Sequence, residues 1–246
     1  MRYIEHITEP EKLLLSWQTS QPGKSRSRMF VAELIRNKDD ADLVYLLDGN
    51  EFQRAQSLGF EEYTGFSVNQ QKHEKVLFAF MKRLPPRSRG DFVKYLDSLR
   101  IQKDADISDF ALLGYSGAKL PDDDFEVIHT FENAIPSFEF LLHVQGYRYY
   151  AERLPFDSIK MEQEATFQAE PENEIDPKAI KIIIGGTHVG YVCRGLTKSF
   201  HKWFEMGYKI DANIERKNGT AARPEIYLYV SIKMPTRPQL MRSCIF

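Results

Sequence analysis

The spacing of hydrophobic positions divides the chain into two parts. Residues 1–134 combine short apolar runs with stretches that repeat every three or four residues, a mixture that predicts strands together with helices. Beyond Pro136 apolar and polar positions alternate, which is the period of a half-buried strand. We therefore expect an α+β protein of two domains, residues 1–134 and 135–246, with residues 133–136 as the linker.

In the first domain, short strands are expected beside several short helices. The polar stretch 19–28, with its Pro-Gly pair, predicts a hairpin with a mobile basic tip. Ser108 is a candidate N-cap and Gly117 follows the end of the same helix, whereas the run 76–81 is short enough to be either strand or helix. The predicted strands cover 13–17, 29–35 and 41–47, and the predicted helices cover 51–58, 88–99 and 107–115.

The second domain is expected to be a small closed or partly closed β-barrel of the OB or SH3 type, with one helix. A Gly-Gly pair at 185–186 predicts a tight hairpin turn, because glycine readily adopts a positive φ. A Lys-Asn-Gly sequence at 217–219 predicts the turn of a final hairpin. The predicted strands cover 138–144, 161–167, 179–184, 188–192, 209–215 and 225–232, and the helix covers 196–206.

Charge and composition restrict the classes of partner. With 33 Lys and Arg against 35 Asp and Glu, the formal net charge is −2, so adhesion to any polyanion is not expected and a basic site must be local. The charge is uneven, at −4 over residues 1–136 and +2 over residues 137–246. The second half is therefore the better place for a polyanion ligand.

Two cysteines, Cys193 and Cys244, are too few for a disulfide framework. The apolar runs are far shorter than the roughly 20 residues of a membrane-spanning helix. The six histidines show no metal-binding spacing. We expect a cytoplasmic, bacterial protein with no membrane partner, no cofactor, no metal and no catalytic residues. Cys193 beside Arg194 could have a lowered thiol pKa, or could be a half-buried small residue.

The most informative string is Gly-Tyr-Arg-Tyr-Tyr at 146–150, expected at the end of a strand. An arginine can pair with a phosphate through two hydrogen bonds while neighbouring rings stack on bases, which is a combination typical of single-stranded nucleic-acid binding. The same string would also fit an ordinary barrel surface.

Two further strings follow in order. Residues 170–182 form a Pro-punctuated acidic turn that enters a strand, Glu-Pro-Glu-Asn-Glu-Ile-Asp-Pro-Lys-Ala-Ile-Lys-Ile. Residues 190–196, Gly-Tyr-Val-Cys-Arg-Gly-Leu, then lead into the helix. In this order and spacing, the three strings resemble the HIRAN domain, a small OB-like barrel that binds DNA. The resemblance extends over residues 137–235.

This resemblance implies binding of single-stranded DNA at a free 3′ end. Arg148 and Tyr149 would contact a phosphate and stack on a base, Asn173 and Asp176 would frame the pocket, and Arg194 would contact a phosphate. Lys198, Arg216 and Lys217 are further candidates for backbone contacts, or else solvated surface charges. Asn173 and Asp176 could also simply satisfy local backbone amides. Ile175 stands where the family has an aromatic residue that stacks on a base. The loss of this stacking would weaken binding by about 1–3 kcal/mol.

In the first domain, residues 80–89 and 109–118 resemble the N-terminal subdomain of HipA-type proteins, with Phe-Met-Lys-Arg-Leu-Pro and Asp-Phe-Ala-Leu-Leu-Gly as the shared elements. The motifs of the HipA kinase lobe are missing from the chain. This domain is therefore expected to bind a protein partner, or to be purely structural. A sensor or targeting subunit in DNA repair, defence or a toxin–antitoxin-like system would fit both resemblances.

Two other functions fit some of the residues. A metal-dependent nuclease would use Asp122 with Asp176 and Lys178, although Pro177 would remove an amide from the strand that is central in that fold. The run Asp122–Asp124 could bind a divalent cation or merely solvate a turn. A protein-interaction adaptor without DNA binding is the third possibility, and it is favoured if the basic residues are dispersed around the barrel.

Overall fold

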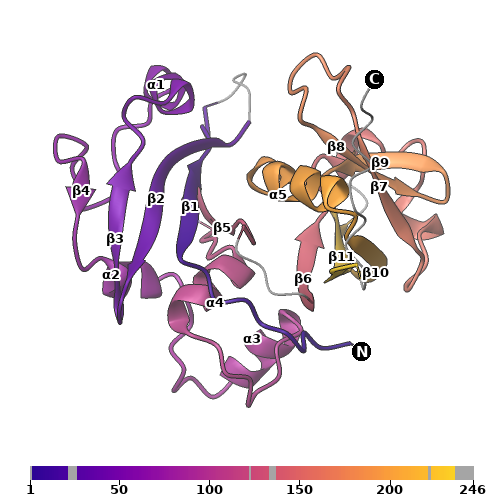
Figure 1. The fold of residues 1–246 in the computed structure, drawn as a ribbon, viewed down its shortest axis with the longest axis horizontal. Helices are drawn as coiled ribbons and strands as arrows, with labels where there is room; N and C mark the ends of the chain where they lie inside the picture. Colours follow the sequence, from indigo (N-terminus) through magenta and orange to yellow (C-terminus); the bar gives the residue numbers. More distant parts are fainter. Residues whose placement is uncertain (1, 22–26, 122, 133–136, 221–222, 236–246) are drawn as a thin grey trace, which may run out of the picture. The chain divides into compact units, whose positions relative to one another are not determined.

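The computed structural model describes residues 2–21, 27–121, 123–132, 137–220 and 223–235. The chain forms two compact units: an N-terminal unit, Thr8–Asn133, and a C-terminal unit, which combines Met1–Ile7 with Ala134–Phe246. Figure 1 traces the elements of each unit along the chain. The fold is α+β with antiparallel strand pairing, as predicted. The helices in the described residues are all too short or too polar to traverse a bilayer.

An antiparallel sheet with the order β4-β3-β2-β1-β5 organises the N-terminal unit. Side chains from its central strands, such as Leu13, Leu34 and Leu43, are almost completely buried and supply the core. The three predicted strands are confirmed, whereas β4 and β5 were not expected from the sequence. The strands are β1 (Lys12–Trp17), β2 (Met29–Asn37), β3 (Asp40–Tyr45), β4 (Lys72–His73) and β5 (Phe125–His129).

The helices of this unit agree with the sequence periodicity. The ambiguous run 76–81 is helical, and Phe80 within it is fully buried. Ser108 caps the last helix, with its Oγ accepting the N–H of Ala111 at 3.0 Å, and Gly117 ends that helix with a φ of 74°. The helices are α1 (Asn50–Ser57), α2 (Leu77–Met81), α3 (Phe92–Ser98) and α4 (Asp109–Ser116).

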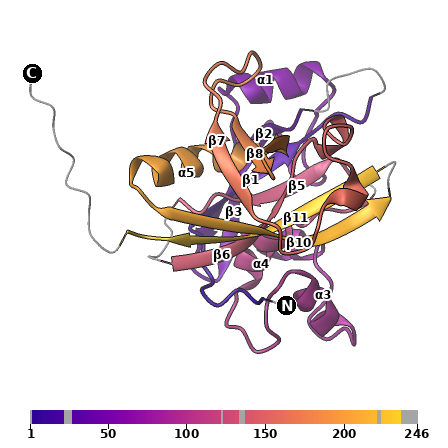
Figure 2. The same cartoon turned by 90° about the vertical axis from the view of Figure 1, so that its right-hand side faces the viewer.

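The C-terminal unit consists of two three-stranded antiparallel sheets, β10-β11-β6 and β7-β8-β9. Figure 2 shows β6, β11 and β10 side by side. Isolated bridges between Gln145 and Tyr191 and between Glu164 and Asn213 join the sheets, as in a partly closed barrel. Its elements are β6 (Ser137–His143), η1 (Tyr147–Tyr149), η2 (Phe156–Ser158), β7 (Ala165–Ala169), β8 (Ile180–Ile184), β9 (Thr187–Tyr191), α5 (Arg194–Glu205), β10 (Lys209–Thr220) and β11 (Arg223–Lys233).

Two predicted boundaries in this unit are wrong. The predicted turn at 217–219 lies inside β10, which pairs with β11 as far as Thr220 and Arg223. Strand β7 begins at Ala165 rather than at Met161, whose side chain is half exposed. Cross-strand pairing in the long hairpin therefore overrides the local turn preference of Asn-Gly.

Residues 2–7 pack on the C-terminal unit, whereas the sequence grouped them with the first domain. The carboxylate of Glu139 on β6 is buried and accepts the backbone N–H groups of Glu5 and His6 at 3.1 and 3.0 Å. The Tyr229 hydroxyl donates to the carbonyl of Tyr3 at 2.8 Å. The two N–H groups compensate the burial of the Glu139 carboxylate. The pattern of apolar residues in the sequence does not predict this contact.

Candidate nucleic-acid interface

The string at 146–150 forms a short 3₁₀ turn after β6, where a strand end was expected. Gly146 adopts a φ of 77°, and the buried Tyr147 donates its hydroxyl hydrogen to the carbonyl of Leu154 at 2.6 Å. This anchored turn leaves Arg148 and Tyr149 at the surface, with Tyr149 71% exposed. The Arg148 guanidinium lies 4.6 Å from the Tyr149 ring centroid and donates to its hydroxyl.

Gly190 brings the third sequence string against this turn. A Cβ at position 190 would lie 2.5 Å from the carbonyl oxygen of Gln145 and 2.7 Å from Val144, at a φ of 149°. Only glycine permits this approach, in which Gln145 and Tyr191 exchange two backbone hydrogen bonds of 2.9 Å. The glycine of the string therefore fixes the position of Tyr191 beside η1.

An aromatic cluster fills the space between η1 and β9. The ring of Tyr150 lies 4.3 Å from His188, and His188 lies 4.8 Å from Tyr191, edge to face. Burial raises the pKa of Tyr191, and hydrogen bonds with Tyr150 and Glu170 raise it further. Burial also lowers the pKa of His188, whose Nε2 lies 3.1 Å from the carbonyl of Gly190. The lowered pKa of His188 and the raised pKa of Tyr191 keep both side chains neutral near pH 7.

Glu170 is the centre of a polar network that joins the acidic turn to two strands. Its carboxylate accepts hydrogen bonds from Lys181 at 2.6 Å, Asn173 at 2.8 Å and the Tyr191 hydroxyl at 2.9 Å. Partial burial alone would raise the pKa of Glu170, but these three donors lower it to about 2. Glu170, Lys181, Tyr191 and His188 were not predicted as site residues, although Glu170, Lys181 and Tyr191 lie inside the quoted strings.

Asn173 and Asp176 hold the acidic turn in shape. The Asn173 Oδ1 accepts the N–H groups of Ile175 and Asp176 at 3.0 and 2.9 Å, and Asp176 Oδ1 accepts the N–H of Lys178 at 2.9 Å. Both side chains therefore satisfy local backbone amides, as the simpler interpretation expected. The other carboxylate oxygen of Asp176 lies 3.5 Å from Nε of Arg194.

The remaining basic candidates lie on two different elements. Arg194 begins α5, and Lys198 follows four positions later on the same side of the helix. Arg216 and Lys217 lie on β10 in the other sheet. There the Arg216 guanidinium stacks 4.1 Å from the Tyr227 ring, and Lys217 donates to the carbonyl of Ile159 at 2.9 Å. Lys217 is thus engaged within the barrel itself.

The tip of the acidic turn is open. The side chain of Ile175 is 91% exposed, although it is large and apolar. Its backbone N–H is held by Asn173, so the turn presents the side chain from a fixed position. A series of contacts runs from Tyr150 through Tyr191 and Asn173 to Asp176, which pairs with Arg194.

A sequence model of the HIRAN domain family matches residues 137–234. Residues 137–234 form a HIRAN domain. All three strings, at 146–150, 170–182 and 190–196, lie inside it. HIRAN domains are DNA-binding modules rather than catalytic ones, and this match supports DNA binding by the C-terminal unit.

Two solved structures are similar to the HIRAN domain region. The HIRAN domain of human HLTF is 21% identical, with a TM-score of 0.30, over 39% of this chain and 76% of its own. A protein from Lactobacillus plantarum is 17% identical, with a TM-score of 0.32, over 37% of this chain and 91% of its own. No curated protein matches the sequence. The resemblance of residues 80–120 to the HipA subdomain stays a prediction.

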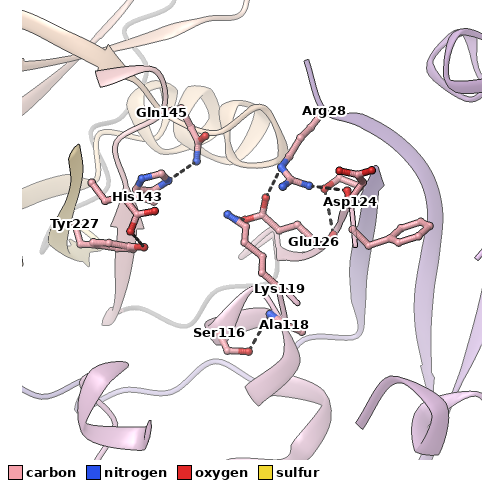
Figure 3. A network of polar contacts seen from close by, with 12 residues as sticks. Arg28, Ser116, Ala118, Lys119, Asp124, Glu126, His143, Gln145 and Tyr227 are labelled. Carbon is pink, nitrogen blue, oxygen red and sulfur yellow. Dashed lines mark hydrogen bonds and ion pairs between the residues drawn. The ribbon is translucent and has the colours of Figure 1, made fainter. Parts of the chain in front are cut away.

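Several other candidates have structural partners or lie outside the described residues. Asp123, from the predicted cation-binding run, accepts two hydrogen bonds from the buried Arg83. Arg28, at the end of the polar stretch, pairs with Glu126, which also pairs with Lys119 (Figure 3). Within the described parts of the chain, no group of three or more metal-ligating side chains comes together. Residues 22–26, Asp122, the expected linker 133–136 and Cys244 lie outside the described residues.

Proposed function

We propose that the HIRAN domain of this protein binds single-stranded DNA, with preference for a free 3′ end. The observation that supports this most is the exposed Arg148–Tyr149 pair beside the Glu170 network. The arginine offers a planar set of donors to a phosphate, and the tyrosine offers an open face to a base. Because η1 and the acidic turn are both anchored, binding would order few additional side chains.

The acidic turn gives a physical reason for selecting an end. The Asp176 carboxylate repels an internal phosphate but can accept a hydrogen bond from a terminal 3′ hydroxyl. Arg194, 3.5 Å from that carboxylate, would bind the adjacent phosphate. Asn173 holds the turn, and Lys198, one helical turn beyond Arg194, would contact the backbone further along. Arg216 is a more distant backbone candidate, and Lys217 the weakest because of its internal hydrogen bond.

We further propose that the whole protein is non-enzymatic, bacterial and cytoplasmic. An N-terminal unit of the HipA-like type would bind a protein partner, while the HIRAN domain recruits DNA. A sensor or targeting role in repair, defence or a toxin–antitoxin-like system would use both units.

Fluorescence anisotropy of the full chain tests the DNA-binding proposal. The probes are one single-stranded oligonucleotide with a free 3′ hydroxyl, the same strand with a 3′ phosphate, and a blunt duplex, each at two salt concentrations. Arg148→Ala and Tyr149→Ala are the test variants. Lys209→Ala is the matched control, since Lys209 is an exposed cation of the same unit paired with Asp211.

We expect the strand with a free 3′ hydroxyl to bind more tightly than the other two probes. Its affinity should fall at least tenfold in Arg148→Ala and stay unchanged in Lys209→Ala. Equal and weak binding of all three probes, insensitive to Arg148→Ala, would contradict the proposal and favour a protein-interaction adaptor. Cleavage of the probe when Mg²⁺ is added would favour the metal-dependent nuclease instead.

A further inference from the structure

The N-terminal unit contains a cavity of about 490 Å³ that the proposed DNA binding does not use. It lies between the segment that follows α2, helix α3 and the end of α4. Its volume is within the range of small-molecule sites in proteins. Its lining includes Lys82, Arg83, Arg89, Ala118 and Lys119.

All of the charged residues that line this cavity are cations. Arg89 pairs with Asp91, but both side chains are about half exposed, so water screens the pair. Lys119 pairs with Glu126 at 2.9 Å, and that carboxylate is shared with Arg28 (Figure 3). Lys82 has no carboxylate partner among the described residues, so the wall carries an excess of positive charge and the cavity favours an anion.

Arg83 gives the wall its shape instead of facing a ligand. Its side chain is only 3% exposed. Its Nε donates to the carbonyl of Ala118 at 2.7 Å, and its two terminal nitrogens donate to Asp123. These bonds fix the backbone next to Lys119. The cavity wall is therefore organised before any ligand arrives.

An exposed aromatic ring lies beside the cavity. Phe78 on α2 is 74% exposed, a large open apolar surface for one side chain. The Nζ of Lys82, which lines the cavity, lies 5.4 Å from the centre of that ring. A flat apolar face next to a cation suits a ligand that has both an aromatic ring and an anionic group.

We propose that this cavity binds a nucleotide. The phosphates lie between Lys82, Arg89 and Lys119, and the base stacks on Phe78. Lysine and arginine are the usual partners of phosphate, and base stacking on an aromatic side chain tolerates different bases. The proposal concerns the N-terminal unit and does not depend on the HIRAN domain binding DNA.

Isothermal titration calorimetry of the full chain with ATP, pyrophosphate and adenosine tests the phosphate-binding and base-binding parts of the site separately. The test variants are Lys82→Glu and Phe78→Ala, both at exposed positions. Lys103→Glu and Val93→Ala are the matched controls, because these two side chains are also exposed in the same unit and do not line the cavity.

ATP is expected to bind, and adenosine to bind at least tenfold more weakly. Lys82→Glu is expected to weaken ATP and pyrophosphate about tenfold, and Phe78→Ala to weaken ATP about tenfold while leaving pyrophosphate unchanged. Absence of ATP binding would overturn the proposal. Equal affinity for ATP and pyrophosphate would also overturn it. So would a Lys82→Glu variant that still binds ATP but no longer binds the oligonucleotide.

Discussion

The imidazole of His129 lies flat against the ring of Phe131, with 3.8 Å between the ring centroids, and its Nδ1 accepts the backbone N–H of that residue at 2.9 Å. The opposite nitrogen, Nε2, lies 3.0 Å from the carbonyl of Thr8 and donates to it. One nitrogen accepts and the other donates, so the ring is held in a single neutral tautomer. Burial lowers the pKa of His129 to about 4, despite the hydrogen bond to Thr8.

This histidine should make the stability of the N-terminal unit depend on pH. The unfolded chain binds a proton near pH 6.5, and the folded chain only near pH 4. Between these values the unfolded state holds more protons, so the free energy of unfolding falls as the pH drops, by about 3 kcal/mol in total. Urea unfolding from pH 7.5 to pH 4 measures this loss. An NMR titration of His129 with a midpoint near 6.5 would contradict it.

Glu170→Gln should destabilise the C-terminal unit and weaken DNA binding. The amide leaves Lys181 without its carboxylate and weakens the bonds from Asn173 and Tyr191, at a cost of about 1–3 kcal/mol at pH 7. Because the folded pKa of Glu170 is about 2 and the ordinary value is 4.5, its contribution is complete above pH 4.5 and disappears as the pH falls towards 2. The difference between wild type and variant in urea unfolding should narrow over that range.

Glu172→Gln is the matched control for this variant, since Glu172 is an exposed carboxylate in the same turn. Its unfolding free energy should stay within about 0.5 kcal/mol of wild type. A similar loss in both variants would mean that charge alone, and not the hydrogen-bonded network, stabilises the turn.

Ile175→Tyr should increase the affinity for a single-stranded 3′ end. The position is 91% exposed, so an aromatic side chain fits without disturbing the core, and stacking on one base is worth about 1–3 kcal/mol. Anisotropy titration should show binding about tenfold tighter than wild type. Ile175→Val serves as the control and should leave the affinity unchanged. Identical affinities of the tyrosine and valine variants would show that the turn does not reach a base.

Lys198 and Lys217 should differ in their effect on the salt dependence of DNA binding. Lys198→Ala should reduce the slope of log affinity against log salt by about 0.7, the value for one phosphate contact on a single strand. Lys217→Ala should leave the slope unchanged and lower stability, because Lys217 donates to Ile159 and lies 4.5 Å from the Phe156 ring. A reduced slope in Lys217→Ala and an unchanged slope in Lys198→Ala would indicate that the DNA contacts β10 instead of α5.

Local patterns predicted most of the elements but not the pairings between distant segments. Strand β5 was not predicted, because its partner β1 lies more than a hundred positions earlier in the chain. In the sheet, Leu13 of β1 lies opposite His129 of β5. The turn at 146–150 was assigned to a strand because the left-handed conformation of Gly146, which ends the strand, has no signature beyond the glycine itself.

The candidate site was predictable where its residues lie in one string and not where they meet across strands. Arg148, Tyr149, Asn173 and Asp176 follow from their strings. The role of Glu170 depends on Lys181 in β8 and Tyr191 in β9, which reach it only after the sheet forms. Conversely, Lys217 looked like a surface charge, because the sequence does not show that Ile159 and Phe156 lie beneath it.

Because residues 2–7 pack on Glu139, the N-terminal unit is inserted between two segments of the C-terminal unit. Residues 2–7 belong to the C-terminal unit, Thr8–Asn133 form the N-terminal unit, and the chain continues the C-terminal unit at β6. A fragment limited to the 137–234 segment would therefore lack the two amides that cover the Glu139 carboxylate and leave a buried charge uncompensated. Excising the domain by its sequence boundaries would thus remove part of its own fold.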